Sequence, residues 1–166
     1  MKIQKLRRRK NKTDYLKRLK LLKSEKPRIV FRKTNKFIIS EYIISKEAQD
    51  TTIIGLDSRK LKEYGWPEKA QGSLKSITSS YLTGYLTGKT IIKRNLEMPI
   101  LDTGMNRAIH KNKIYGFIKG LIDAGIKINC DKNFFPDESR IKGQHLKNKI
   151  PFDEIKLKID KKEGKN

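Results

Sequence analysis

Apolar and polar side chains alternate along residues 28–57, the pattern that predicts β-strands. Three runs rich in β-branched residues lie here, over residues 28–34, 37–44 and 51–57. The first two are joined only by the turn at residues 34–36, so we predict that they form an antiparallel hairpin.

Beyond the third run the apolar period becomes that of a helix. Residues 73–93 and 112–125 repeat apolar side chains every three or four positions, and Gly125 suits the left-handed residue that often ends a helix. Short apolar runs at residues 97–104 and 126–131 predict two further strands. This order of strands and helices predicts an α/β fold with a mixed sheet and packed helices.

The first 36 residues carry most of the excess charge, with 16 Lys and Arg against two acids, a net charge of +14 out of +22 for the whole chain. Residues 1–12 show no periodicity and predict an extended basic arm. Residues 13–24 predict a short helix with Thr13 as its N-cap, stopped by Pro27. Such a segment repels itself and needs an acidic partner to become ordered, most commonly a polyanion such as a nucleic acid.

These patterns divide the 166 residues into three parts. We expect a basic arm with a short helix over residues 1–26, an α/β domain that binds nucleic acid over 27–132, and a loop with a Lys-rich tail over 133–166. The tail, from residue 151, reads as a charged helix or a frayed end. No apolar run is long enough to span a membrane, and no secretory signal is visible. The chain is therefore expected to be soluble and cytoplasmic, and the single Cys130, which excludes an internal disulfide, suits a reducing cytosol. His110 and His145 are too far apart for a metal signature, so we expect no metal and no cofactor.

One glycine-rich stretch, residues 84–90, resembles the end of a phosphate-binding loop. That loop needs four residues between its glycines, whereas here there are three, within a helical pattern. The four-residue spacing of Ser80, Gly84 and Gly88 instead predicts a smooth helix face for close packing.

Three acids offer the alternative of a metal-dependent nuclease. Asp57 and Asp102 end predicted strands and Asp123 lies near the end of a helix, and strand-end carboxylates can hold two Mg²⁺ ions. The same acids also suit ordinary roles, because Asp at a strand end bonds to nearby backbone. Asp123 can pair with Lys119 or Lys127 on its own helix.

Basic and aromatic residues are interleaved in the first part of the chain, a pattern typical of RNA binding. Rings can stack on unpaired bases, and Arg can hold phosphates in a fork of hydrogen bonds. Arg28 and Arg32 share one face of the first strand, and Lys33 lies on the other. Besides RNA binding and nuclease activity, a third possibility is that the basic arm holds the protein on an anionic membrane surface. The interleaved rings are Tyr15, Phe31, Phe37, Tyr42 and Tyr64.

Several short motifs follow one another in a fixed order from residue 13 to about 146. This ordered set resembles the archaeal and eukaryotic type of the large-subunit ribosomal protein L eighteen family. Each motif alone is weak, but the order is specific. The motifs are residues 13–24, 26–36, 63–66, 80–89, 101–106, 120–125 and 141–145.

The resemblance implies a ribonuclease-H-like sheet, of the type found in components of the translational machinery, without nuclease activity. It implies a structural constituent of the large ribosomal subunit that binds 5S rRNA. With a second 5S-binding ribosomal protein, such a constituent helps attach the 5S rRNA to the large-subunit rRNA as the central protuberance. No membrane partner is implied. The residues that match the RNA-contacting stretch are Arg7, Arg8, Arg9, Lys10, Lys12, Tyr15, Arg18, Arg28, Arg32, Lys33, Asn35 and Lys36.

Overall fold

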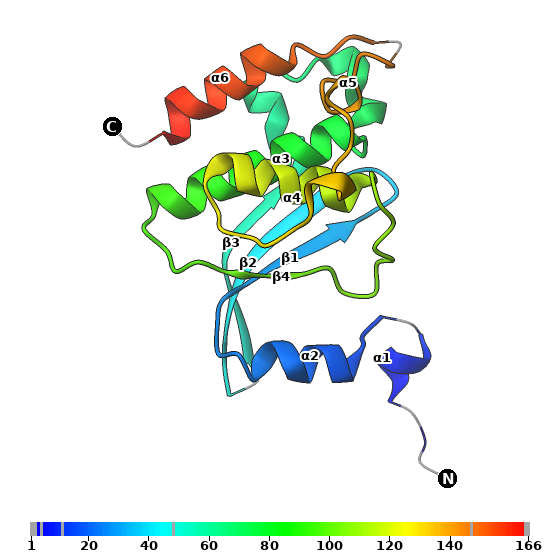
Figure 1. Ribbon diagram of the computed structural model, residues 1–166, viewed down its shortest axis with the longest axis vertical. Helices are drawn as coiled ribbons and strands as arrows, with labels where there is room; N and C mark the ends of the chain where they lie inside the picture. Colours follow the sequence, from blue (N-terminus) through cyan, green and yellow to red (C-terminus); the bar gives the residue numbers. More distant parts are fainter. Residues whose placement is uncertain (1–2, 4, 11, 48, 147, 165–166) are drawn as a thin grey trace.

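A computed structural model describes residues 3, 5–10, 12–47, 49–146 and 148–164. A four-stranded mixed sheet lies at its centre, with a layer of helices on one face (Figure 1). The α/β fold class predicted from the sequence is therefore confirmed. Residues 1, 2, 4 and 11 of the predicted arm, and 147, 165 and 166 of the predicted tail, lie outside the described residues.

The sheet has the strand order β3-β2-β1-β4. Strands β1 and β2 form the predicted antiparallel hairpin, and β2 also pairs antiparallel with β3. Strand β4 is short and pairs parallel with β1, so β1 lies in the interior of the sheet. The strands are β1 (Arg28–Lys33), β2 (Ile38–Lys46), β3 (Gln49–Asp57) and β4 (Ile100–Asp102).

The predicted strand at residues 126–131 is wrong, because this segment is irregular and pairs with no strand. Its alternation has another cause. Ile126 is buried and packs near Gly88 of the helix layer, while Lys127 is exposed. A loop that runs over a helix buries every second side chain just as a half-buried strand does, so alternation alone cannot separate the two.

Two long helices, α3 (Ile77–Lys93) and α4 (Lys113–Ala124), cover one face of the sheet (Figure 1). Both were predicted, and Gly125 ends α4 with φ of 110° as expected. The shorter elements are η1 (Ser58–Tyr64), η2 (Glu68–Ser73), η3 (Lys132–Phe134) and α5 (Glu138–Ile141).

The tail is a helix rather than a frayed end. Helix α6 (Phe152–Glu163) lies on the outer side of α3, with Ile155 and Ile159 fully buried. Asp160 accepts a hydrogen bond from the Tyr85 hydroxyl at 2.7 Å and pairs with Lys89 at 2.9 Å. The tail is therefore part of the folded body.

The basic N-terminal segment forms two helices, α1 (Leu6–Arg9) and α2 (Tyr15–Leu22), at the end of the molecule opposite α6 (Figure 1). The N-cap of α2 is Asp14 and not the predicted Thr13. The Asp14 carboxylate accepts hydrogen bonds from the backbone N–H groups of Leu16 and Lys17 at 3.1 and 3.3 Å. An Asp side chain one residue nearer the helix satisfies these orphan donors, which Thr13 does not reach.

Helices α3 and α4 run parallel at very close range, as the smooth face of α3 predicted. The Ser80 hydroxyl donates to the Lys113 carbonyl at 2.6 Å, near the start of α4. Further along, a Cβ on Gly84 would overlap the Phe117 carbonyl, and one on Gly120 would overlap the Tyr81 carbonyl. Glycine on both helices therefore sets their separation.

We predict that Gly120→Ala destabilises the protein by about 3 kcal/mol, because the added methyl group meets backbone atoms that cannot move alone. Urea unfolding followed by circular dichroism measures the change. Gly55→Ala is the matched control, since a Cβ there meets only the Thr52 methyl group at 3.9 Å. Equal stability for the two variants would contradict the close helix packing.

Candidate nucleic-acid interface

A cleft opens beside β1 at the point where β4 ends. β4 pairs only with Arg28, Ile29 and Val30, so β1 continues to Lys33 without a neighbour on that side. The chain after β4 turns away at Asp102–Gly104, and the N-terminal segment forms the remaining wall. The unequal lengths of two parallel strands thus create the hollow.

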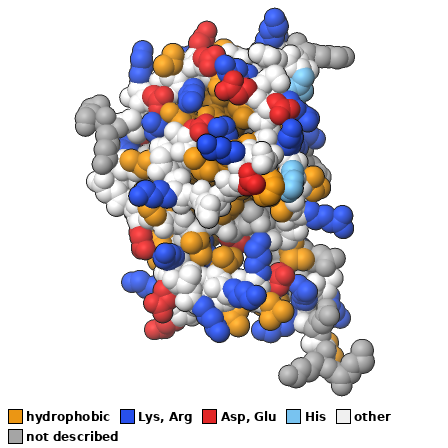
Figure 2. Space-filling model, in the orientation of Figure 1, with side chains coloured by type: hydrophobic (Ala, Val, Ile, Leu, Met, Phe, Trp, Pro, Cys, Tyr) orange, Lys and Arg blue, Asp and Glu red, His pale blue; other side chains and the backbone are white. Residues whose placement is uncertain are grey.

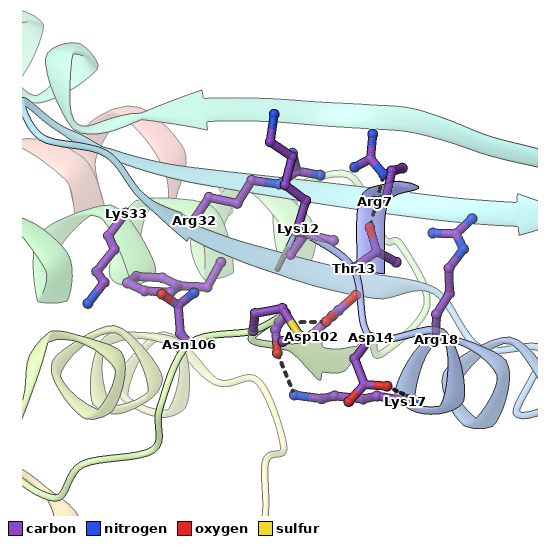
Figure 3. A pocket seen from close by; sticks show the side chains of 14 residues that line it. Arg7, Lys12, Thr13, Asp14, Lys17, Arg18, Arg32, Lys33, Asp102 and Asn106 are labelled. Atoms are coloured by element: carbon purple, nitrogen blue, oxygen red, sulfur yellow. Dashed lines mark hydrogen bonds between the residues drawn. The ribbon is translucent and has the colours of Figure 1, made fainter. Parts of the chain in front are cut away.

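The cleft has a volume of about 370 Å³. Its walls bring together cations from the N-terminal segment and from the end of β1 (Figure 3). Basic side chains also spread over the visible face of the whole molecule (Figure 2). The cations that line the cleft are Arg7, Lys12, Lys17, Arg18, Arg32 and Lys33.

The two acids that line the cleft are both engaged. Asp14 caps α2 and pairs with Arg8 at 3.4 Å. Asp102 accepts hydrogen bonds from the Arg28 guanidinium at 2.9 Å and from the backbone N–H of Gly104 at 2.8 Å. Each carboxylate therefore forms its ion pair with an arginine that does not line the cleft, Asp14 with Arg8 and Asp102 with Arg28.

Arg28 and Arg32 share one face of β1, as expected, but they differ in exposure. Only 2% of Arg28 is exposed, whereas the Arg32 side chain is 60% exposed. The Arg28 guanidinium donates to Asp50 at 2.7 Å, to Asp102 at 2.9 Å and to Ser45 at 3.1 Å. Burial without such partners would be very costly, so these contacts fix Arg28 in a structural role.

Asp50 continues this network to helix α2, since it also accepts a hydrogen bond from Arg18 at 2.8 Å. Burial raises the pKa of Asp50, but hydrogen bonds from Arg18 and Ser45 and the charge of Arg28 outweigh it and lower the pKa to about 2. The carboxylate is therefore ionised at neutral pH and holds α2 against the sheet.

The structure brings some of the predicted RNA-binding residues together and leaves others apart. Arg7, Lys12, Arg18, Arg32 and Lys33 share the cleft. Outside it, Arg8 pairs with Asp14, and Lys5 covers the Tyr15 ring with its amino group 4.8 Å from the ring centre. Four further predicted residues are exposed but do not line the cleft: Arg9, Lys10, Asn35 and Lys36.

Three of the five interleaved aromatic rings are buried and cannot stack on bases. Phe31, Tyr42 and Tyr64 are each at most 4% exposed and belong to the core. For Phe31 and Tyr42 the alternation with charged residues reflects the two faces of a half-buried strand, whereas Tyr64 ends the 3-10 helix η1. Tyr15 and Phe37 are partly exposed.

Sequence reasoning missed one wall of the cleft. Lys17 donates to the Thr103 hydroxyl at 2.9 Å and to the Gly104 carbonyl at 3.2 Å, so it ties α2 to the loop after β4. Met105 and Asn106 of that loop also line the cleft. The signal was present, because residues 101–106 form one of the ordered motifs, but nothing local in that motif indicates RNA binding.

The three acids of the nuclease alternative do not meet. Asp57 and Asp102 lie on the two outer strands, separated by three strand spacings of about 14 Å. Each is paired with an arginine, Asp57 with Arg59 and Asp102 with Arg28. Asp123 accepts a hydrogen bond from the Tyr81 hydroxyl at 2.7 Å. In the described part of the chain, no three His, Cys, Asp or Glu side chains cluster as metal ligands would.

The fold and the cleft define a basic α/β protein with a surface suited to a polyanion. No helix within the described ranges is long and apolar enough to cross a membrane. Comparison with known proteins narrows this class further. Residues 1–98 match the family described as "Ribosomal large subunit proteins 60S L5, and 50S L18".

Curated relatives agree with this family and are large ribosomal subunit proteins uL18. The Korarchaeum cryptofilum protein is 42% identical over 140 residues, which cover 84% of this chain and 70% of the relative. The Methanosphaera stadtmanae protein is 39% identical over 145 residues, covering 87% and 73%. The Haloquadratum walsbyi protein is 41% identical over 140 residues, covering 84% and 66%.

The chain therefore belongs to the uL18 family of the large ribosomal subunit. This confirms the resemblance carried by the ordered motifs. Members of this family are structural ribosomal proteins and not enzymes, so the nuclease alternative is set aside.

We predict that Arg28→Met lowers the free energy of unfolding by about 3 kcal/mol, because Asp50 and Asp102 lose their shared cation inside the fold. Urea unfolding at neutral pH measures this loss. Arg32→Met is the matched control on the same strand, and its exposed ion pair with Glu41 contributes little. Similar losses for both variants would contradict the difference in their roles.

The lowered pKa of Asp50 predicts how the free energy of unfolding depends on pH. Its pKa is lower in the folded protein, about 2, than the ordinary value of 3.8. The resulting stabilisation is complete above about pH 5 and is lost as the pH falls toward 2. Its size is on the order of 1 kcal/mol, less than the full shift implies because Asp50 is partly exposed.

Unfolding measured between pH 5 and pH 2.5 tests this pH dependence. Asp50→Asn should be less stable than the wild type at pH 5, and the two should converge at low pH. A constant difference across this range would contradict the contribution of the Asp50 charge.

Proposed function

We propose that this chain binds 5S rRNA through the basic cleft and helps attach it to the large-subunit rRNA, forming the central protuberance with a second 5S-binding ribosomal protein. The observation that carries the proposal is the convergence of cations from separate segments on one cleft whose acids are already engaged. Membership of the uL18 family supports the ribosomal setting.

The chemistry of the cleft suits an RNA backbone. Arg7, Lys12 and Arg32 offer charged donors from different positions around the cleft (Figure 3), so they can meet successive phosphates of the RNA. The nearby Asn106 side chain adds a polar group, although one of its donors is used by the Thr103 carbonyl at 2.8 Å. A protein with six to ten phosphate contacts loses roughly 10³–10⁵ in affinity between 50 and 200 mM salt.

The strand order supports a ribonuclease-H-like sheet, in which an antiparallel meander of β1, β2 and β3 is extended by β4 parallel to β1. We further propose that helix α1 adjusts to the RNA on binding. Helix α1 is only four residues long and buries none of them, so little in the protein fixes its position.

We predict that Arg32→Gln weakens binding of 5S rRNA about tenfold and lowers the salt slope, d log K/d log[salt], by about 1 in magnitude, without loss of stability. Filter binding across a salt series measures both quantities. Arg94→Gln removes the same charge from an exposed arginine at the far end of α3 and should leave the slope unchanged.

Deleting residues 1–12 provides a second test, because it removes cleft cations and, among the described residues 3, 5–10 and 12, no buried side chain. A longer deletion to residue 36 would remove β1 from the interior of the sheet and is not informative. RNA binding that is insensitive to both Arg32→Gln and this deletion would overturn the assignment of the cleft.

A further inference from the structure

A second group of cations lies next to the cleft, between the end of β1 and the first turns of α3 and α4. We propose that Lys33, Lys75 and Lys113 form a further phosphate-binding site, which holds a backbone phosphate of the same RNA. The inference rests on the proposed function, because it adds a contact to that RNA. Lys75 and Lys113 belong to none of the motifs or cleft walls described above.

Lys33 lies on the side of β1 that packs against α4. The Phe31 and Phe117 rings touch across the sheet–helix interface, with their centres 5.0 Å apart. Lys33 is two residues beyond Phe31 and so points to the same face of β1, the face that bears the helices. In Figure 3 its side chain points away from Arg32. Lys113 is one helical turn before Phe117, on the same side of α4.

Lys75 lies at the start of α3. Because α3 and α4 are parallel, their N-terminal ends lie together, joined by the hydrogen bond between Ser80 and Lys113. A Cβ on Gly116 would lie 3.1 Å from the Ile77 methyl group, so the first turn of each helix touches the other. Lys75 immediately precedes the α3 N-cap, Ser76, and therefore lies beside this junction.

Lys33, Lys75 and Lys113 differ from the other cations of the fold in their surroundings. No ion pair joins any of them to a carboxylate in the described part of the chain. Burial lowers the pKa of Lys113, and the charges of Lys75 and Lys33 lower it further, as expected for like charges held close together. This group therefore lacks the compensation that Arg28 receives from Asp50 and Asp102.

The helix ends add to this positive charge. The first turns of α3 and α4 contain no acid, although the N-terminus of a helix favours one. Helix α6 of the same protein follows the usual rule, with Asp153 and Glu154 in its first turn. The positive ends of the two helices and the three lysines add their charges at this junction, and no acid lies in the first turn of either helix. An external anion offsets that charge.

A phosphate of RNA is the anion that best fits this place. Lys33 lines the cleft and also faces α4, so the basic surface continues from one to the other without a break. Lysine binds phosphate as a point charge and reads no base. The expected role of the site is thus to fix the direction in which the RNA backbone leaves the cleft.

The test uses the full chain, a 5S rRNA transcript and the variant Lys75→Gln/Lys113→Gln. The salt slope for RNA binding should fall by about 1 to 2 in magnitude, with affinity at a fixed salt concentration several-fold weaker. The thermal midpoint without RNA should stay the same or rise, because repulsion is removed. A merely structural role predicts the opposite change in stability.

Lys127→Gln/Lys161→Gln is the matched control, since it removes the same charge from two exposed lysines, and it should keep the wild-type slope. Lys75→Arg/Lys113→Arg should also bind like the wild type. A wild-type slope in the Lys75→Gln/Lys113→Gln variant, or a clear fall in its thermal midpoint, would overturn this site and leave the cleft intact. Failure of the wild-type chain to bind 5S rRNA would overturn the proposed function itself.

Discussion

The buried guanidinium of Arg28 holds the sheet and the N-terminal helix together. Arg28 belongs to β1, and its donors reach Ser45 on β2, Asp50 on β3 and Asp102 on β4. Asp50 in turn binds Arg18 of α2. One side chain therefore connects all four strands and, through one carboxylate, the helix that walls the cleft. The planar fork of arginine suits this role, because it offers several donors in fixed directions.

This network also explains why the cleft is so basic. Asp102 lines the cleft and Asp50 lies on the outer strand β3, and both form ion pairs with Arg28. Their charge balances the buried Arg28, and Asp50 is shared with Arg18 of α2. The protein thus keeps its strands tied by ion pairs and still presents a cationic surface, which would be impossible if the same acids faced Arg32 and Lys33.

Much of the fold could be predicted from the sequence, because the strands and helices are amphipathic and their periods differ. The site could be predicted only in part. Arg28 and Arg32 are the same residue type on the same face of one strand, yet one is buried and the other exposed. The difference depends on Asp50 and Asp102, which are 22 and 74 positions away from Arg28. The lysines at the helix junction depend likewise on the packing of α3 against α4.

The shortness of β4 has a consequence for how the cleft can change. Since β4 ends after three residues, the opposite wall is formed by an irregular loop that contributes no ladder hydrogen bonds to the sheet. The width of the hollow can therefore vary with the length and sequence of that loop while strand pairing stays intact. The shape of the hollow is thus separable from the core that supports it.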